Sequence, residues 1–141
     1  MDILTPAERS RVMSRITGKN TGPERVVRSL LHRLGFRFRL HRRDLPGKPD
    51  LVLPGRNAVI FVHGCFWHRH QGCKDATIPK TNTAFWLNKL NRNVERDLKA
   101  AAALKAAGWG VLYVWECETN DLDTLADRLT RELTALPGAT L

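Results

Sequence analysis

Two uninterrupted apolar runs, residues 58–62 and 111–115, constrain the fold more than any other feature. A strand with one face in water alternates apolar and polar residues, whereas a run without alternation is typical of a strand covered on both faces. Between the runs, apolar residues recur at helical spacing and predict a long helix over about residues 83–107. A strand, a helical crossover and a second strand build a parallel or mixed sheet. The predicted class is therefore α/β.

The remaining elements are predicted from local signals. Thr5, Pro6 and Glu8 indicate a capped helix over about residues 5–15, and a second helix should begin at Thr21 or Gly22 and end at Gly35. Alternation predicts a strand over residues 36–40 with a wet, basic face, followed by a short strand over 50–53 and, near the end, a helix over 123–136. The buried face of the long helix should consist of Leu87, Leu90, Val94, Leu98, Ala101 and Leu104. Together these elements predict a mixed sheet flanked by helices on both faces.

The sequence is strongly basic, and the excess charge is concentrated in its N-terminal third. The net charge is +9; residues 1–48 hold twelve Lys and Arg against four Asp and Glu, whereas residues 119–141 hold two against four. A concentrated basic face favours a polyanionic partner, because neutralising phosphates releases counterions and adds to affinity. We therefore expect a nucleic-acid partner, with a merely basic protein as the alternative.

Several classes of protein are disfavoured. No apolar stretch approaches the roughly 20 residues that span a bilayer, and the first six residues show no apolar core of a signal peptide. Three cysteines do not suit a disulfide framework and favour a reducing compartment. We expect a cytoplasmic protein with no membrane partner. Because no heptad pattern suggests a dimer, we also expect a monomer.

All three cysteines lie near the ends of the two apolar runs. Cys65 and Cys73 flank a polar loop that contains His68 and His70, and Cys117 follows the second run. Three thiolates and one imidazole are a donor set that structural zinc prefers. The spacing allows either histidine as the fourth ligand, and three free cysteines in the core are the alternative. Because the loop has little apolar content to fix it, we expect one zinc ion to brace it.

A candidate catalytic centre lies close by. Asp50 opens a predicted strand, and Glu24 lies at the start of the second helix. A carboxylate at a strand start, followed by a hairpin to a buried strand, is typical of nucleases that hold magnesium, a hard cation that binds oxygen. The usual Asp/Glu-x-Lys motif is missing, which leaves Asp50 and the Val62 carbonyl as ligands and histidines to move protons. Asp50 could instead be a turn residue, and Glu24 a capping-box partner of Thr21.

Seven stretches in unbroken order resemble the Vsr family, the very-short-patch-repair DNA mismatch endonucleases. The longest is VIFVHGCFWHRH at residues 59–70. The others are RVMSRI at 11–16, NTGPE at 20–24, LPGKPD at 45–50, FWLNK at 85–89, NVERD at 93–97, and residues 108–109 with 114–117. One such motif could arise by chance, whereas seven in the same order are specific.

The resemblance implies a restriction-endonuclease-like fold that nicks one DNA strand 5′ to the thymine of a T:G mismatch. That mismatch arises in its native context by deamination of 5-methylcytosine. The resemblance implies magnesium, with two ions expected, at Asp50 and the Val62 carbonyl. His63 and His68 then lie in the active site, and Glu24 lies at its edge. We expect His68 to be the acid–base group and His63 to support the phosphate or its hydrated metal.

The resemblance also implies zinc ligands and a role for aromatic residues. The implied zinc ligands are Cys65, His70, Cys73 and Cys117. Phe66, Trp67 and Trp86 would insert into the base stack, with Met13 approaching from the opposite groove. Unstacking costs less at a mismatch, so insertion favours damaged sites. For Trp86 a place in the core is the alternative, and Trp109 and Trp115 are expected to pack in the core.

Two departures from the family pattern bear on these assignments. Position 62 is Val where some members have Thr, which is harmless if only the backbone carbonyl binds metal. Two residues separate His70 from Cys73, so the local zinc geometry is open to a shift.

We expect a single domain over residues 1–141, with an N-terminal helix and DNA-contacting arm at 1–22 and a catalytic core at 23–136. The expected substrate is double-stranded DNA containing a mismatch, and repair-pathway proteins are further candidate partners. One alternative is a nuclease of the same scaffold with relaxed mismatch or sequence choice. Another is a non-catalytic, zinc-stabilised module that binds distorted DNA. The combination of Asp50, His63 and His68 disfavours the module, because a pure binder gains nothing from a carboxylate beside an anionic ligand.

Overall fold

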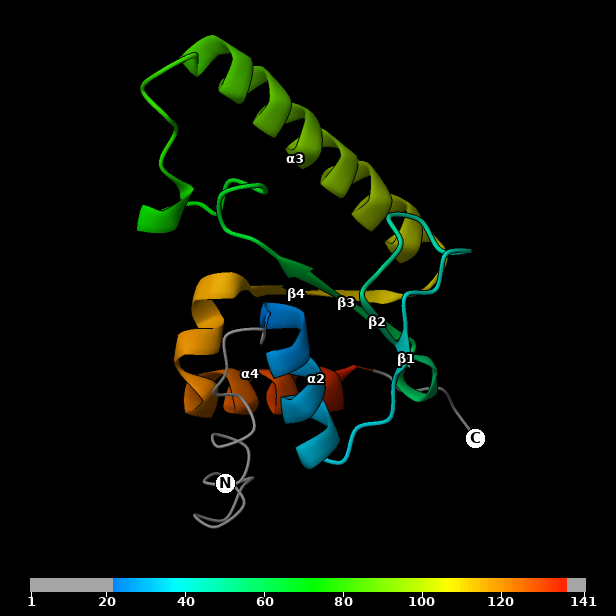
Figure 1. Ribbon diagram of the computed structural model, residues 1–141. Coiled ribbons are helices and arrows are strands. Elements are labelled where there is room, and N and C mark those ends of the chain that lie inside the picture. The colour runs from blue at the N-terminus through cyan, green and yellow to red at the C-terminus, as the bar shows by residue number, and fades with distance from the viewer. Residues whose placement is uncertain (1–21, 137–141) are drawn as a thin grey trace.

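The computed structural model describes residues 22–136, which form a four-stranded mixed sheet with helices on both faces (Figure 1). The strands lie in the order β1 (Arg39–Leu40), β2 (Leu51–Leu53), β3 (Ala58–His63) and β4 (Gly110–Trp115). The β1–β2 and β2–β3 pairs are antiparallel, whereas β3 and β4 run parallel. Helix α3 (Thr83–Ala106) makes the crossover that a parallel pair requires. The predicted mixed sheet is confirmed.

Alternate residues of the strands face two separate cores. One core packs against α2 (Pro23–Arg33) and α4 (Leu122–Ala135), and its strand residues are Leu51, Leu53, Ala58, Ile60, Leu112 and Val114. The other core holds Val52, Val59 and Phe61 with Leu104 of α3. Because side chains alternate across a strand, a strand with no polar position must be covered on both sides. Figure 1 shows β3 in that place, between α3 and the layer of α2 and α4.

Helix α2 begins at Pro23 and ends where the chain reverses at Gly35. Gly35 has a φ of +87°, which costs glycine little, and the N–H of Phe36 donates to the Leu31 carbonyl across this turn at 3.0 Å. The N-cap is Gly22, which has no side chain. The capping-box interpretation of Glu24 is therefore wrong, and its carboxylate is available for other contacts.

Two predictions about the elements are wrong in part. The strand expected over residues 36–40 is only Arg39–Leu40, because Phe36 and Phe38 pack against the α2–α4 core before the chain reaches the sheet edge. Leu98 was expected on the buried face of α3, yet its side chain is 64% exposed. The reason is that Leu98 lines an open cavity between α3, β4 and the loop that follows β3.

The remaining helices and strands within residues 22–136 lie close to their predicted positions. Short 3-10 helices occur at Pro54–Arg56, Lys74–Ala76 and Glu116–Asn120. Within residues 22–136, no helix combines the length and apolar character that a membrane crossing needs. The helix predicted over residues 5–15, including Met13, lies outside the described residues.

Candidate active site and metal centre

Two carboxylates from different elements meet at the start of β2. The Oδ2 atom of Asp50 accepts a hydrogen bond from the N–H of Val62 on β3, at 2.7 Å. Glu24 lies in the first turn of α2, and its Oε1 is 2.6 Å from the Nε2 of His41. The potential ligand atoms of Glu24, His41 and Asp50 lie within 4.8 Å of one another. Carboxylate oxygens this close together can hold a hard divalent cation.

The electrostatics of Asp50 suit such a cation. Burial raises the pKa of Asp50 above its ordinary value, and the hydrogen bond from Val62 opposes that effect. The nearby charge of Glu24 raises the pKa further. Two carboxylates that repel each other in a partly dry site are stabilised by a shared cation.

A pair of stacked histidines forms a second cluster. The rings of His63, at the end of β3, and His68 have centroids 3.7 Å apart and an interplanar angle of 7°. The Nδ1 of His68 is 2.6 Å from Oδ2 of Asp97 on α3. His63 is buried, and burial together with the charge of His68 lowers its pKa to about 4, so its ring is neutral at neutral pH. Its buried Nδ1 has no hydrogen-bond partner among residues 22–136.

Both clusters contribute to one cavity of about 500 Å³. Its lining includes Asp50, Val62, His63, His68 and Asp97, together with the basic residues Arg43, Lys48 and Arg96. Glu24 is held next to Asp50 but does not line this cavity. Two carboxylates, two imidazoles and several cationic side chains around one space suit an anionic ester that reacts with the help of a metal.

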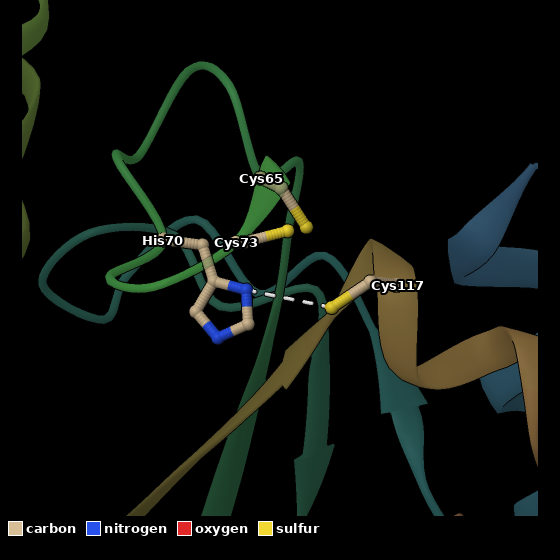
Figure 2. Close-up of side chains that lie close together, drawn as sticks. All are labelled: Cys65, His70, Cys73 and Cys117. Atoms are coloured by element: carbon tan, nitrogen blue, oxygen red, sulfur yellow. Dashed lines mark hydrogen bonds between the residues drawn. The ribbon is translucent and has the colours of Figure 1, made fainter. Parts of the chain in front are cut away.

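A third cluster gathers the cysteines (Figure 2). Cys65, His70 and Cys73 come from the loop after β3, and Cys117 comes from the 3-10 helix Glu116–Asn120 that follows β4. Their potential ligand atoms lie within 4.8 Å of one another, with the His70 Nδ1 3.4 Å from the Cys117 Sγ. All three cysteines are free thiols. Three sulfurs and one imidazole nitrogen are the donor set of a tetrahedral metal site.

Two thiols of this cluster, those of Cys65 and Cys117, resist ionisation in the absence of a cation. Burial and the neighbouring thiols raise the pKa of Cys117 to about 12, and burial also raises the pKa of Cys65. A bound cation replaces the thiol protons, so its binding free energy adds to folding. The structure places His68 away from the sulfurs and against Asp97, although the spacing had allowed either His68 or His70 in the cluster.

Trp115 lies between the histidine pair and the cysteine cluster. Its ring stacks on the His70 ring with a centroid distance of 4.2 Å. The His63 ring lies at a steep angle to the Trp115 ring, with a centroid distance of 5.2 Å. Its backbone N–H donates to the Oε1 of Glu118 at 3.0 Å. Trp115 was expected to pack in the core, but it is half-buried and bridges the two sites. Trp109 does pack against the core beneath α3.

Three aromatic side chains gather beside the cysteine cluster. The Phe66–Trp67, Phe66–Trp86 and Trp67–Trp86 centroid distances are 5.1, 5.5 and 6.0 Å. Trp67 is 46% exposed, and the Nζ of Lys89 lies 5.5 Å from its ring centroid. The side-chain amide of Asn93 donates to the Trp67 carbonyl at 3.1 Å and ties this loop to α3. The half-buried Trp86 belongs to this surface cluster and to neither core.

Comparison with known proteins identifies the family. The family model described as DNA mismatch endonuclease Vsr matches residues 1–75. A type II nicking enzyme of Xanthomonas oryzae pv. oryzae, V.XorIIP, is 52% identical over 128 residues, which cover 91% of this chain and 93% of that protein. The chain belongs to the Vsr family. The resemblance deduced from the sequence is thereby confirmed.

Two further Vsr relatives match over most of their length. The type II nicking enzyme V.NmeAIP of Neisseria meningitidis is 45% identical over 130 residues, which cover 92% of each chain. The DNA mismatch endonuclease Vsr of Escherichia coli (strain K12) is 42% identical over 131 residues, covering 93% of this chain and 83% of that protein. Members of the family are thus named as nucleases that nick DNA.

Sequence reasoning missed two residues of this Vsr site, Asp97 and His41. For Asp97 a signal existed, because it lies four residues before Ala101 and seven after Leu90, on the inward face of the long helix. A carboxylate on that face is unusual enough to mark a partner for a buried polar group. For His41 no signal existed, because its approach to Glu24 depends on the path of the chain between β1 and β2.

Proposed function

We propose that this protein is a magnesium-dependent endonuclease that nicks one strand of duplex DNA 5′ to the thymine of a T:G mismatch and so starts very short patch repair. The observation that carries the proposal is the cavity shared by Asp50, His63 and His68. The names of the relatives, a DNA mismatch endonuclease and a nicking enzyme, support a mismatched substrate and the cutting of one strand. The protein acts as a monomer and hands its nicked product to further repair proteins.

The donor set around Asp50 fits magnesium. Asp50 and the Val62 carbonyl would hold the metal, with Glu24 at the edge of the site, and two ions are expected to act. Two observations support this assignment: Glu24 and Asp50 lie close together, and the pKa of Asp50 is raised. Both indicate that the two ionised carboxylates destabilise each other unless a cation is bound between them. Magnesium supplies charge neutralisation at the scissile phosphate and lowers the pKa of a bound water.

His68 is the acid–base group. Asp97 binds its Nδ1 and fixes the ring, which leaves Nε2 as the nitrogen that takes or returns a proton. The neutral ring of His63 stacks on His68 and lines the same cavity, where it can support the phosphate or its hydrated metal. The cationic side chains of the cavity offset the charge of the DNA backbone.

Mismatch selection is assigned to the aromatic cluster of Phe66, Trp67 and Trp86. Insertion of such side chains between bases costs a few kcal/mol per step and less at a mismatch, so the cluster favours sites that are already weakened. Its exposure and the nearby Lys89 ammonium support contact with an anionic duplex. Met13 is proposed to enter from the opposite groove.

The Cys65, His70, Cys73 and Cys117 cluster is proposed to hold one structural zinc ion. Zinc would fix the loop between β3 and α3, which carries His68 and two of the aromatic residues, Phe66 and Trp67. Support comes from the donor set, since three thiols and an imidazole match tetrahedral zinc and leave no open position for chemistry. Metal analysis of the purified protein should therefore find about one zinc per chain.

A panel of end-labelled duplexes tests the function. We expect a single nick on the thymine strand of the T:G duplex with magnesium, and no nick with EDTA. Equal cleavage of perfectly paired DNA would indicate a nuclease with relaxed choice. Tight binding to T:G without cleavage at any magnesium concentration would indicate a non-catalytic module.

Asp97→Asn is expected to slow nicking by about 100-fold, toward the low end of what a positioned acid–base group contributes. The Asn side chain has no charge to stabilise the protonated form of His68. Its N–H₂ can also donate to Nδ1 and so favour the wrong tautomer of His68. Single-turnover rates and DNA affinity should be measured together, and affinity should change little. Asp127→Asn, an exposed residue on α4, is the matched control. An unaltered rate for Asp97→Asn would remove Asp97 from the mechanism.

A further inference from the structure

His41 contacts both carboxylate-bearing residues of the proposed magnesium site. Its backbone N–H donates to the Asp50 carbonyl at 3.1 Å, and its Nε2 lies 2.6 Å from Oε1 of Glu24. An ionised carboxylate only accepts hydrogen bonds, so Nε2 carries the proton in this contact. The φ of His41 is +50°, a conformation that residues with a side chain adopt at a cost. Such strain at a functional cluster points to a role.

Glu24 needs a partner to stay where it is. It lies in the first turn of α2, whereas Asp50 directly precedes β2, and the two carboxylates repel each other. A glutamate side chain has several rotatable bonds and would otherwise turn toward water. The imidazole of His41 donates to Glu24 from the side of the loop between β1 and β2. This contact offsets the repulsion and fixes the rotamer of Glu24.

We propose that His41 is a positioning residue that holds the Glu24 carboxylate beside Asp50, at the edge of the metal site, so that the negative charges of both carboxylates stabilise one divalent cation. The inference rests on the proposed function, which places the cation at Asp50. His41 does not itself bind the metal, because Glu24 occupies its Nε2 and magnesium prefers oxygen donors. Its role is that of the outer hydrogen-bond partners that orient metal ligands in many proteins.

Manganese binding to the full-length, zinc-loaded protein tests the inference without DNA and without catalysis. Free Mn²⁺ is counted from its EPR signal during a titration, and Mg²⁺ affinity follows from competition. His41→Ala should weaken Mn²⁺ and Mg²⁺ binding about 10-fold, the low end for loss of such a partner. His41→Gln should restore binding, because its amide N–H₂ can donate to Glu24. His32→Ala, an exposed histidine in the last turn of α2, is the matched control and should bind as the parent does.

The double variant supplies a readout that a merely structural role would not move. In a Glu24→Ala background, which removes the acceptor of the His41 N–H, His41→Ala should cause no further loss, because the residue acts through Glu24. An additive loss would overturn the inference. Wild-type metal affinity in His41→Ala would also overturn it. Failure of His41→Gln to restore binding would overturn it as well, because it would mark the imidazole nitrogen as a direct ligand.

Asp50→Asn separates this inference from the proposed function. If Asp50→Asn binds Mn²⁺ as well as the parent does, the metal site itself is wrong. If Asp50→Asn loses binding while His41→Ala keeps it, only the positioning role is wrong. Because the His41 side chain is 56% exposed, thermal unfolding of His41→Ala and His41→Gln should show folded proteins.

Discussion

Asp50→Asn should abolish nicking, with a fall of about 1000-fold in the single-turnover rate, while the protein still folds and binds mismatched DNA. A catalytic metal contributes several kcal/mol to the barrier, and each factor of ten corresponds to about 1.4 kcal/mol. The amide keeps an oxygen that can accept the N–H of Val62, so the contact between β2 and β3 survives. Rates on the T:G duplex and mobility-shift affinity measure the two effects separately.

Asp44→Asn is the matched control for this prediction. Asp44 is an exposed carboxylate in the loop that precedes Asp50, and its partner is Arg42, at 2.6 Å. Both substitutions remove one negative charge from the same region, so their effects on DNA affinity should be alike. Only Asp50→Asn should lose nicking. Full activity of Asp50→Asn would exclude the proposed magnesium site.

His70→Ala and His68→Ala should damage the protein in opposite ways. His70 lies 3.4 Å from Cys117, so its loss should lower zinc from about one ion per chain to near zero and reduce the unfolding temperature sharply. His68 contacts Asp97 and no sulfur, so His68→Ala should keep its zinc and its fold. Its nicking rate should fall by about 100- to 10,000-fold, the contribution of a positioned acid–base group.

Metal analysis, thermal unfolding and nicking of the same preparations distinguish the two variants. The pair controls itself, because each substitution removes one imidazole from the same loop. Loss of zinc from His68→Ala, with zinc retained by His70→Ala, would reverse the assignment. Normal nicking by a zinc-free His70→Ala protein would show that the loop does not need a metal to hold His68.

Much of the fold could be predicted because the strongest signals are local. The unbroken apolar run at 58–62 is β3, and the period of the long helix gives α3 nearly to the residue. The errors arose where tertiary packing prevailed over a local pattern. Phe36 and Phe38 alternate as in a strand but leave the sheet for the α2–α4 core, and Leu98 keeps its helical phase but faces an open cavity.

The site residues could be predicted only where they lie in sequence motifs that the Vsr family shares. Resemblance to the Vsr family selected Asp50, His63 and His68, and the structure brings them to one cavity. It also selected His70, which lies with the cysteines. The partners of these residues could not be predicted. Asp97 is 29 positions from His68 in the sequence, and His41 is 17 positions from Glu24. Such pairs depend on how loops cross the sheet, and no spacing rule encodes that path.

Helix α3 carries one residue of the aromatic cluster and one residue of the cavity that Asp50, His63 and His68 line. Trp86 lies in its first turn and Asp97 near its middle. The rise of an α-helix sets their separation along the axis at about 16 Å. Under the proposed function, a duplex that receives the aromatic cluster at one end of α3 would meet His68 and Asp97 at a fixed distance from it. Under the proposed function, α3 would therefore fix the distance between the distortion and the cut by backbone geometry, without contacts to the bases at the cut.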